Sequence, residues 1–506
     1  MINQLERVGS GERPAAPLLA SVGLLLVALI PAAAVMDIPT PIVVGVAGML
    51  ALVVLALRPD FATLLVVAIV YSNAAVVAVH VHNVPFALAA GSSGLLVVPL
   101  CYYLLVRRKS LTIPPALPWI LGYLVIQLVS TMLSRDSASA SESVGIFLTE
   151  GVLLFVLIVN AVRTERMVLS IVWVLLAVGA ILGGLSLHQE LTQNFSNDYL
   201  GFAQVGGTGE DILAGQEAES RTAGPLGRAN RYAQVMVLLL PLVLAIVWGR
   251  YSRRASLLAI GAGVLITIAV ALTLSRGAAV GFALVVAVML ALRYIRIRHI
   301  AFVAVAVVIL FVVVPQYGTR LGSLERLPGL ADEGVAADGS IRSRITETIA
   351  AALVFVDHPL IGVGPGQFST YYIGYAEEFG LRVRAEDREA HNLYFGIAAD
   401  TGLLGSIFFF GAIGVTIRDL SRTRSRLLRV RPQLAHLAAG FMLAIVAYLT
   451  TGIFLHLAFE RYLWLMLALG AAISAIGVQY PAALGENDQP TPDERPSVRV
   501  VRQTST

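Results

Sequence analysis

The stretch EAHNLYFGIAADTGLLGS, residues 389–406, joins a long polar interval of the chain to an apolar helix. The polar interval is rich in Arg, Asp and Glu, and His391 and Asn392 stand where it ends. A titratable side chain at a membrane surface, under a large folded loop, is where a membrane-embedded enzyme would hold its chemistry. The residues around this junction therefore decide both the fold and the candidate site.

The composition is that of an integral membrane protein. Of the 506 residues, 57% are hydrophobic and 13% are charged, whereas soluble domains carry about 25% charged residues. The one cysteine, Cys101, excludes an intrachain disulfide, so the polar loops must fold without one. Lys109 is the only lysine, and arginine carries almost all of the positive charge. We interpret this charge as a topology signal and expect no nucleic-acid partner.

Apolar runs predict about fourteen transmembrane helices, because a helix needs about 20 mostly apolar residues to cross a bilayer. The predicted spans are 15–36, 41–57, 61–80, 85–106, 114–133, 144–162, 167–187, 231–248, 255–274, 277–292, 299–315, 392–416, 434–455 and 459–478.

Arginine clusters orient these spans. The clusters follow the fourth, sixth, eighth, tenth and twelfth spans, at 107–109, 163–166, 249–254, 293–298 and 418–432. All five fall on one face, and cytoplasmic loops carry the excess of Lys and Arg. We therefore expect both termini in the cytoplasm. The cluster at 418–432 also suits contact with anionic lipid of the inner leaflet.

The predicted fold is an all-α polytopic membrane protein with a large, partly helical extracytoplasmic loop. A helix is expected over 342–357, ending before Pro359 and a GVGPG turn at 362–366. The predicted divisions are a cytoplasmic N-terminus (1–14), an N-terminal transmembrane bundle (15–187), an outer loop (188–230), transmembrane helices with an SRG turn (231–315), the large loop (316–391), C-terminal transmembrane helices (392–478) and a disordered cytoplasmic tail (479–506).

Four polar features share the outer face under this topology. They are GPLGRANRYAQ with Arg228, Asn230 and Arg231; LTLSRGAAVG with Ser275 and Arg276; the loop residues Arg342 and Arg344; and His391 with Asn392. Guanidinium groups bind phosphate oxygens in a planar fork. Several arginines beside lipid therefore suit a pyrophosphate headgroup, and His391 suits proton transfer from a hydroxyl.

Structural alternatives exist for the two most prominent side chains. Arg276 could extend to lipid headgroups at the surface, and His391 could cap a helix or bond a backbone carbonyl. Positive-inside bias disfavours an outer arginine, which favours a functional role for Arg276. The chain contains no HExxH, paired CxxC, Walker A or strand-linked GxGxxG motif, so we expect no metal and no cofactor.

Four stretches, in this order, carry a family resemblance: GRANRYA, LSRGAAVG, RSRITETIAAALVFVDHPLIGVGPGQF and AHNLYFGIAADTGLLG. Through them, residues 220–410 or so resemble the bacterial O-antigen ligase and O-antigen polymerase superfamily. The chain departs from the family pattern at Thr348, where a tryptophan is usual four residues after the loop arginine. This leaves Arg342 and Arg344 as alternatives for that arginine. The first motif also departs from the usual pattern before Asn230.

The resemblance implies a metal-independent glycosyltransferase of the GT-C membrane type. Such an enzyme moves a glycan from undecaprenyl pyrophosphate to a hydroxyl of a glycan, lipid or protein acceptor, on the outer face of the bacterial cytoplasmic membrane. By this resemblance Arg276 and Arg344 would contact pyrophosphate, and His391 would activate or position the acceptor. Arg228, Asn230, Arg231, Arg342, Asn392 and Ser275 would line the substrate site.

Two questions stay open at the level of the sequence. Ligase and polymerase use the same donor and differ only in acceptor, so the motifs do not separate them. A transporter or flippase of lipid-linked sugars would also suit fourteen spans. A transporter would be expected to keep charges at mid-membrane and to show an internal repeat. The charges here gather at one face and no clear repeat is visible, which favours the enzyme.

Overall fold

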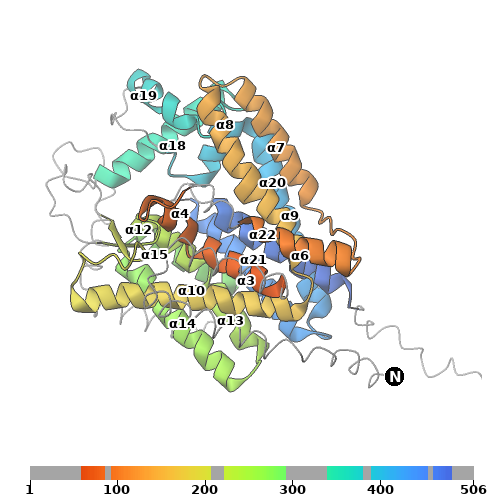
Figure 1. The fold of residues 1–506 in the computed structure, drawn as a ribbon. Helices are drawn as coiled ribbons and strands as arrows, with labels where there is room; N and C mark the ends of the chain where they lie inside the picture. Colours follow the sequence, from red (N-terminus) through yellow and green to blue (C-terminus); the bar gives the residue numbers. More distant parts are fainter. Residues whose placement is uncertain are drawn as a thin grey trace, which may run out of the picture.

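The structure, a computed structural model, describes residues 59–85, 93–206, 221–291, 294, 339–379, 389–453 and 460–480. Most of them are helical, and Figure 1 shows the helices packed as a bundle with α18 and α19 set at its upper edge. The expected spans 15–36, 41–57 and 299–315 lie outside the described residues, as do both chain ends and the loop before residue 339.

Among the described residues, seven helices are long and apolar enough to cross a membrane. They are Ser137–Ala161 (α8, η4 and α9), Glu165–Thr192 (α10), Ala229–Gly249 (α12 and α13), Arg253–Leu272 (α14), Leu393–Leu427 (α20), Pro432–Thr451 (α21) and Arg461–Val478 (in α22). The pair α3 (Pro59–Tyr71) and α4 (Ala74–His80) is bent by 58° and makes an eighth if it is counted as one span. The protein is thus an all-α membrane protein.

Three further apolar helices coincide with expected spans but are shorter than the seven helices of membrane-spanning length. They are α6 with η3 (Val97–Cys101, Tyr102–Val106), α7 (Leu117–Met132) and α15 (Arg276–Ala291). One boundary differs clearly from expectation, because α20 does not end near residue 416 but runs through the first half of the basic cluster to Leu427. Arginine is a good helix former and is soluble beyond the bilayer, so the arginines at 418–426 continue the helix.

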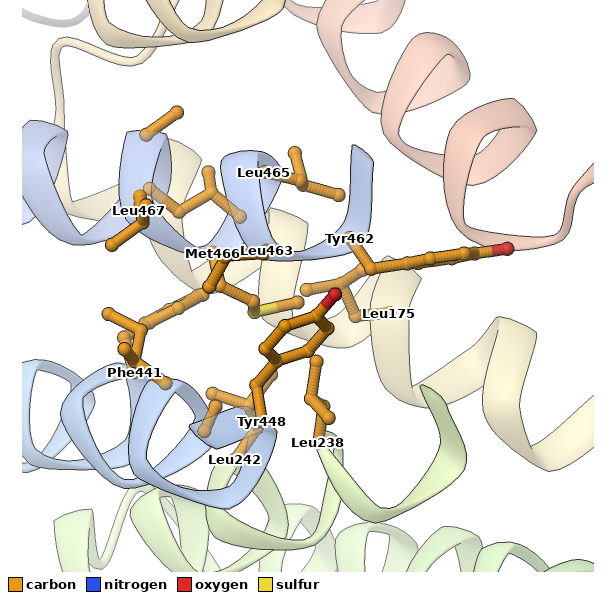
Figure 2. Close-up of a cluster of buried hydrophobic side chains, with 14 of the residues drawn as sticks. Leu175, Leu238, Leu242, Phe441, Tyr448, Tyr462, Leu463, Leu465, Met466 and Leu467 are labelled. Atoms are coloured by element: carbon orange, nitrogen blue, oxygen red, sulfur yellow. The ribbon is translucent and has the colours of Figure 1, made fainter. Parts of the chain in front are cut away.

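The transmembrane helices pack through a continuous apolar core. Figure 2 shows part of it, where Phe441 and Tyr448 of α21 face Tyr462 and Met466 of α22, with Leu175 of α10 beside them. All five side chains belong to the buried core. Because lipid is as apolar as leucine, such packing holds the helices together chiefly through van der Waals contact.

The helix ends that carry basic clusters meet at one end of this bundle. Arg163, after α9, donates to the carbonyl of Ser110 before α7, over 3.1 Å. Tyr480, after α22, donates to Glu165 at the start of α10, and Arg431 lies 5.0 Å above the Tyr480 ring. We call this the basic end. Its composition agrees with the arginine parity expected from the sequence.

The large loop forms a small helical unit with its own core. It contains α18 (Gly339–Asp357), which includes the helix expected over 342–357, and α19 (Phe368–Glu378). A separate apolar cluster joins Ala351 and Val354 of α18 to Tyr372 of α19 and Ala399 of α20. Burial, together with a hydrogen bond to Asp357, raises the pKa of Tyr375 to about 12, so this phenol stays protonated.

The GVGPG turn is inserted into a break in α20. Gly402 has φ 66° and ψ −165°, which interrupts the helical hydrogen bonds at that point. Leu403 and Leu404 donate instead to the carbonyls of Pro359 and Leu360, over 2.8 and 3.1 Å. The Asp400 carboxylate accepts from the amides of Gly366 and Phe368. The loop unit is therefore bonded to α20 by backbone groups, directly after the His391 segment.

The turn between α7 and α8 also contacts the loop unit. The Ser130 hydroxyl donates to the carbonyl of Ile361 over 2.8 Å. Arg135 lies 4.1 Å above the ring of Tyr371 in α19, a cation–π contact. The loop unit thus rests on the end of the bundle opposite to the basic end.

One small sheet adds to the helical fold. Strands β1 (Gln204–Gly206) and β2 (Arg221–Gly224) pair antiparallel, with Val205 opposite Thr222. They lie within the expected outer loop 188–230, of which residues 207–220 fall outside the described part of the chain. The sheet leads directly into α12 (Ala229–Val237) and α13 (Leu240–Gly249).

Candidate functional site

His391 lies against a buried carboxylate of the loop unit. Its Nδ1 atom is 2.7 Å from Oε2 of Glu347 and 3.0 Å from the carbonyl oxygen of Glu389. The carbonyl accepts a hydrogen bond and the carboxylate attracts positive charge, so the arrangement favours a hydrogen on Nδ1. The neutral ring then carries its basic lone pair on Nε2.

The backbone at His391 is strained. Its φ of 37° places it in the left-handed region, which non-glycine residues seldom adopt. The side chain is 24% exposed, so the ring is accessible from solvent while one edge is held. Strain of this kind persists only where the surroundings over-determine the conformation, and it is enriched at functional sites.

Glu347 is a site residue that the sequence reasoning missed. Its side chain is 1% exposed, and a buried carboxylate needs a charged or hydrogen-bonding partner. Arg344 precedes it by three residues in α18, so both lie on one side of the helix. The buried Ala351 continues the same stripe. This signal was available in the sequence, because a carboxylate one turn after an arginine shares its face.

The side of α18 that carries Glu347 helps to distinguish the two loop arginines, Arg342 and Arg344. Arg344 is half-buried on the stripe that contains Glu347, while the side chain of Arg342 lies outside the described part of the structure. The shared face places Arg344 on the side of α18 that carries Glu347, the residue that contacts His391. A role for either residue in substrate binding stays a prediction.

Asn392, and not His391, caps α20. Its Oδ1 atom accepts from the amides of Tyr394 and Phe395, and its Nδ2 atom donates to the carbonyl of Ile453. The amide of Leu393 also bonds the carbonyl of Gly452 over 2.8 Å. These contacts give Asn392 a structural role that joins the start of α20 to the end of α21. A contact between Asn392 and substrate remains a prediction.

The SRG turn is as tight as the sequence indicates. Helix α14 ends at Leu272 and α15 begins at Arg276. Leu274 has φ 50°, and Ser275 is 1% exposed, so the serine side chain lies inside the turn. Arg221 of β2 donates from Nε to the carbonyl of Thr273 over 3.1 Å. The small sheet, a feature not expected from the sequence, therefore supports the turn.

The start of α12 is tied to the His391 segment. Arg231 donates to Oε2 of Glu389 over 2.6 Å, and its side chain is 11% exposed. Arg228 is exposed at the first position before the helix, and Asn230 is half-buried inside its first turn. Glu389 precedes His391 by two residues, so the ion pair brings Arg231 close to the His391 segment. Like Glu347, Glu389 was not singled out by the sequence reasoning.

Helix α21 links α12 and α15 at this level. Gln234 of α12 donates to the hydroxyl of Thr451, which ends α21. A Cβ atom on Gly281 of α15 would lie 2.5 Å from the Thr451 side chain. Arg276 precedes Gly281 by five residues, or about 7.5 Å of helix. Arg276, Arg231 and His391 therefore belong to one end of the bundle, which we call the site end.

Helices α12, α15 and α20 are among the described helices that begin at the site end. The N-terminus of a helix carries about half a positive charge and unpaired amides, which favour bound anions. The arginines at these starts add full charges. Among the residues that the structure describes, no group of three or more His, Cys, Asp or Glu side chains could hold a metal ion. The arrangement can thus bind an anion and offer a base beside it.

Residues 261–410 match a family model described as O-antigen ligase. This part of the chain is a domain of the O-antigen ligase family. The match begins inside α14 and ends inside α20, so this O-antigen ligase domain contains the SRG turn, the loop unit and His391. It excludes the start of α12 with Arg228 and Arg231. A comparison with curated proteins found no match.

The O-antigen ligase match and the membrane helices together establish two points. The resemblance stated from the sequence is confirmed for residues 261–410, whose match points to polysaccharide biosynthesis, and the long apolar helices are those of a membrane protein.

Proposed function

We propose that the protein is a glycosyltransferase that moves a glycan from undecaprenyl pyrophosphate to an acceptor hydroxyl on the outer face of the bacterial cytoplasmic membrane. The observation that carries this proposal is the Glu347–His391 pair, held at the helix end where Arg231 and Arg276 also lie. About fourteen helices of a GT-C-like arrangement, with both termini in the cytoplasm, would place this end outside.

The proposed reaction needs electrostatics and positioning more than a cofactor. The acceptor oxygen attacks C1 of the sugar while the bond from C1 to the pyrophosphate oxygen breaks. The acceptor proton passes to Nε2 of His391, and Glu347 stabilises the resulting imidazolium through Nδ1. Charge grows on the departing pyrophosphate, where Arg276 and Arg344 would stabilise it at a weakly screened lipid boundary. Arg228, Asn230, Arg231, Arg342, Asn392 and Ser275 would position the donor.

Loss of the guanidinium at Arg276 is expected to lower transfer by about 100-fold or more, because it would remove a charge that stabilises the leaving group. The measurement is transfer from undecaprenyl-pyrophosphate glycan by purified protein in nanodiscs, with EDTA present. Arg254→Ala is the matched control, since Arg254 is exposed at the opposite end of the α14–α15 hairpin.

Three outcomes would overturn parts of this proposal. Full activity of Arg276→Ala would remove Arg276 from the leaving-group site. A wild-type protein that makes no product, but moves the lipid-linked glycan between vesicle leaflets, would be a transporter. Loss of wild-type transfer in EDTA, restored by added divalent metal, would contradict the metal-independent reaction.

A single displacement from the face opposite to pyrophosphate is expected to invert the anomeric centre. NMR of the new glycosidic linkage, compared with the donor linkage, measures this directly. Retained configuration would rule out the one-step mechanism and require a covalent or ionic intermediate.

Ligase and polymerase are two forms of the same proposal that differ in acceptor. A deletion strain distinguishes them through its glycan profile. Long lipid-linked chains that fail to reach their final acceptor indicate a ligase, and single repeats alone indicate a polymerase.

A further inference from the structure

A cavity of about 600 Å³ opens at the basic end of the bundle, far along α20 from His391. Its walls are the segment before α7, the end of α9, the last third of α20 and the end of α22. Four arginines line it, from α20 and the end of α9, together with one carboxylate, Asp419. The cavity therefore carries a surplus of positive charge that the proposed transferase site does not use.

Two of the four arginines are held by the protein. Arg163 donates to Oδ1 of Asn160 over 2.6 Å and to the hydroxyl of Thr112. Arg418 pairs with Asp419 over 3.0 Å. These two guanidiniums shape the wall, and their hydrogen-bonding capacity is partly used within the fold.

The other two arginines have no such partner. Among the described residues, neither Arg422 nor Arg426 makes a hydrogen bond or an ion pair, and the Nε atom of Arg426 is buried without an acceptor. A buried donor without an acceptor costs about 1–3 kcal/mol. An anion in the cavity would satisfy it, and the two side chains, one helical turn apart, could share one phosphate.

Much of the remaining lining is apolar, although Thr112, Thr416, Thr423, Ser474 and Gln479 also contribute. Val159 of α9 and Ala471, Ala475, Ile476 and Val478 of α22 face the cavity. Such a wall suits a hydrocarbon chain and does not suit a fully hydrated small ion. The ligand chemistry indicated is that of an amphiphile with an anionic head.

The position of the cavity along α20 agrees with a lipid headgroup. The helix has 35 residues and a break at Gly402, so it extends over at most about 52 Å at 1.5 Å per residue, whereas the hydrocarbon core is about 30 Å thick. If α20 enters the hydrocarbon near Leu393, it leaves it about 20 residues later, before Arg422 and Arg426. Both arginines then lie at headgroup depth, with the apolar wall beside them.

We propose that this cavity binds one anionic phospholipid of the inner leaflet, with its phosphate held by Arg422 and Arg426 and an acyl chain along α22. Basic pockets between transmembrane helices on the cytoplasmic side are known to bind anionic headgroups in this way. The site is independent of the transferase chemistry, because it lies at the other end of the bundle.

The test is native mass spectrometry of the full chain released from nanodiscs that contain phosphatidylglycerol and phosphatidylcholine. Wild type is expected to retain one phosphatidylglycerol in preference to phosphatidylcholine. R422A/R426A is expected to retain at least about fivefold less, and R422K/R426K an intermediate amount. R253A/R254A is the matched control, since it removes the same charge from exposed positions that do not line the cavity. Thermal unfolding in detergent verifies that each variant is folded.

Three outcomes would overturn the proposal. Equal retention of phosphatidylglycerol by wild type and R422A/R426A would show that these arginines do not hold it. Arginine-dependent stabilisation by inorganic phosphate, equal to that by the lipid, would indicate a site for soluble phosphate. Binding that requires deletion of residues 481–506 would show that this C-terminal segment, and not lipid, fills the cavity.

Discussion

Replacement of His391 by alanine is expected to lower glycan transfer by about 10²- to 10⁴-fold, the usual contribution of a general base. The structure supports this through the 2.7 Å approach of Nδ1 to Oε2 of Glu347 and the hydrogen bond between Nδ1 and the Glu389 carbonyl, which leave the basic lone pair of the neutral ring on Nε2. Donor binding should be retained, because the arginines proposed to bind the pyrophosphate are unchanged. Steady-state kinetics with purified protein would show the loss in kcat.

A second substitution separates this role from a purely structural one. His391→Gln keeps a side-chain N–H that can donate to Glu347 but cannot take a proton at neutral pH. If His391 is the base, His391→Gln should be as inactive as His391→Ala. If the ring only ties the α18 and α20 segments together, His391→Gln should recover most of the activity.

Glu347 should act through His391 and not alone. Glu347→Gln is expected to lower transfer by about tenfold or more, since the imidazolium loses its counter-charge. The same change in a His391→Ala background should cost almost nothing, because groups that act as a unit are non-additive. Additive losses would contradict the coupling and assign Glu347 a separate structural role. Glu347→Asp, which keeps the charge, should restore part of the activity.

The second large effect is expected on stability, at the break in α20. Gly402→Ala places a side chain at φ 66° and ψ −165°, a conformation that glycine almost alone adopts. The new Cβ atom would also lie 2.4 Å from the backbone of Leu360 and Ile361. Strain and overpacking together should cost about 2–6 kcal/mol, a large part of the roughly 5–15 kcal/mol that stabilises a typical domain.

Gly414→Ala in the same helix is the matched control. A Cβ atom there meets no other atom within 4 Å, and alanine is the better helix former by about 1 kcal/mol. The midpoint temperature of thermal unfolding in detergent should therefore fall steeply for Gly402→Ala and stay level or rise for Gly414→Ala. An unchanged midpoint for Gly402→Ala would mean that the GVGPG turn is not locked into α20.

The break in α20 at Gly402 connects the stability of the loop unit to glycan transfer. The turn at 362–366 bonds Asp400, which lies less than three helical turns after His391. The same loop unit carries Glu347. Loosening the insertion at Gly402 should thus separate Glu347 from His391 before the whole bundle unfolds, so transfer should be lost at lower temperature than helix content.

Hydropathy and arginine bias, which act locally, determined much of the architecture. The runs near 167–187, 255–274 and 434–455 each became a helix of membrane-spanning length, because apolar side chains in lipid require every backbone group to bond within its own segment. The helix within 342–357 followed from its apolar spacing. The family resemblance came from short motifs whose order is visible without any structure, and residues 261–410 confirmed it.

Contacts between distant segments were decided only by the tertiary structure. Glu347 meets His391, Arg231 meets Glu389, and Arg221 supports the SRG turn through a small sheet that no periodicity indicated. Hydropathy places each helix in the membrane but does not say which helices are neighbours. The partner of a buried charge depends on how those helices pack, and this is why the sequence predicted His391 without its carboxylate.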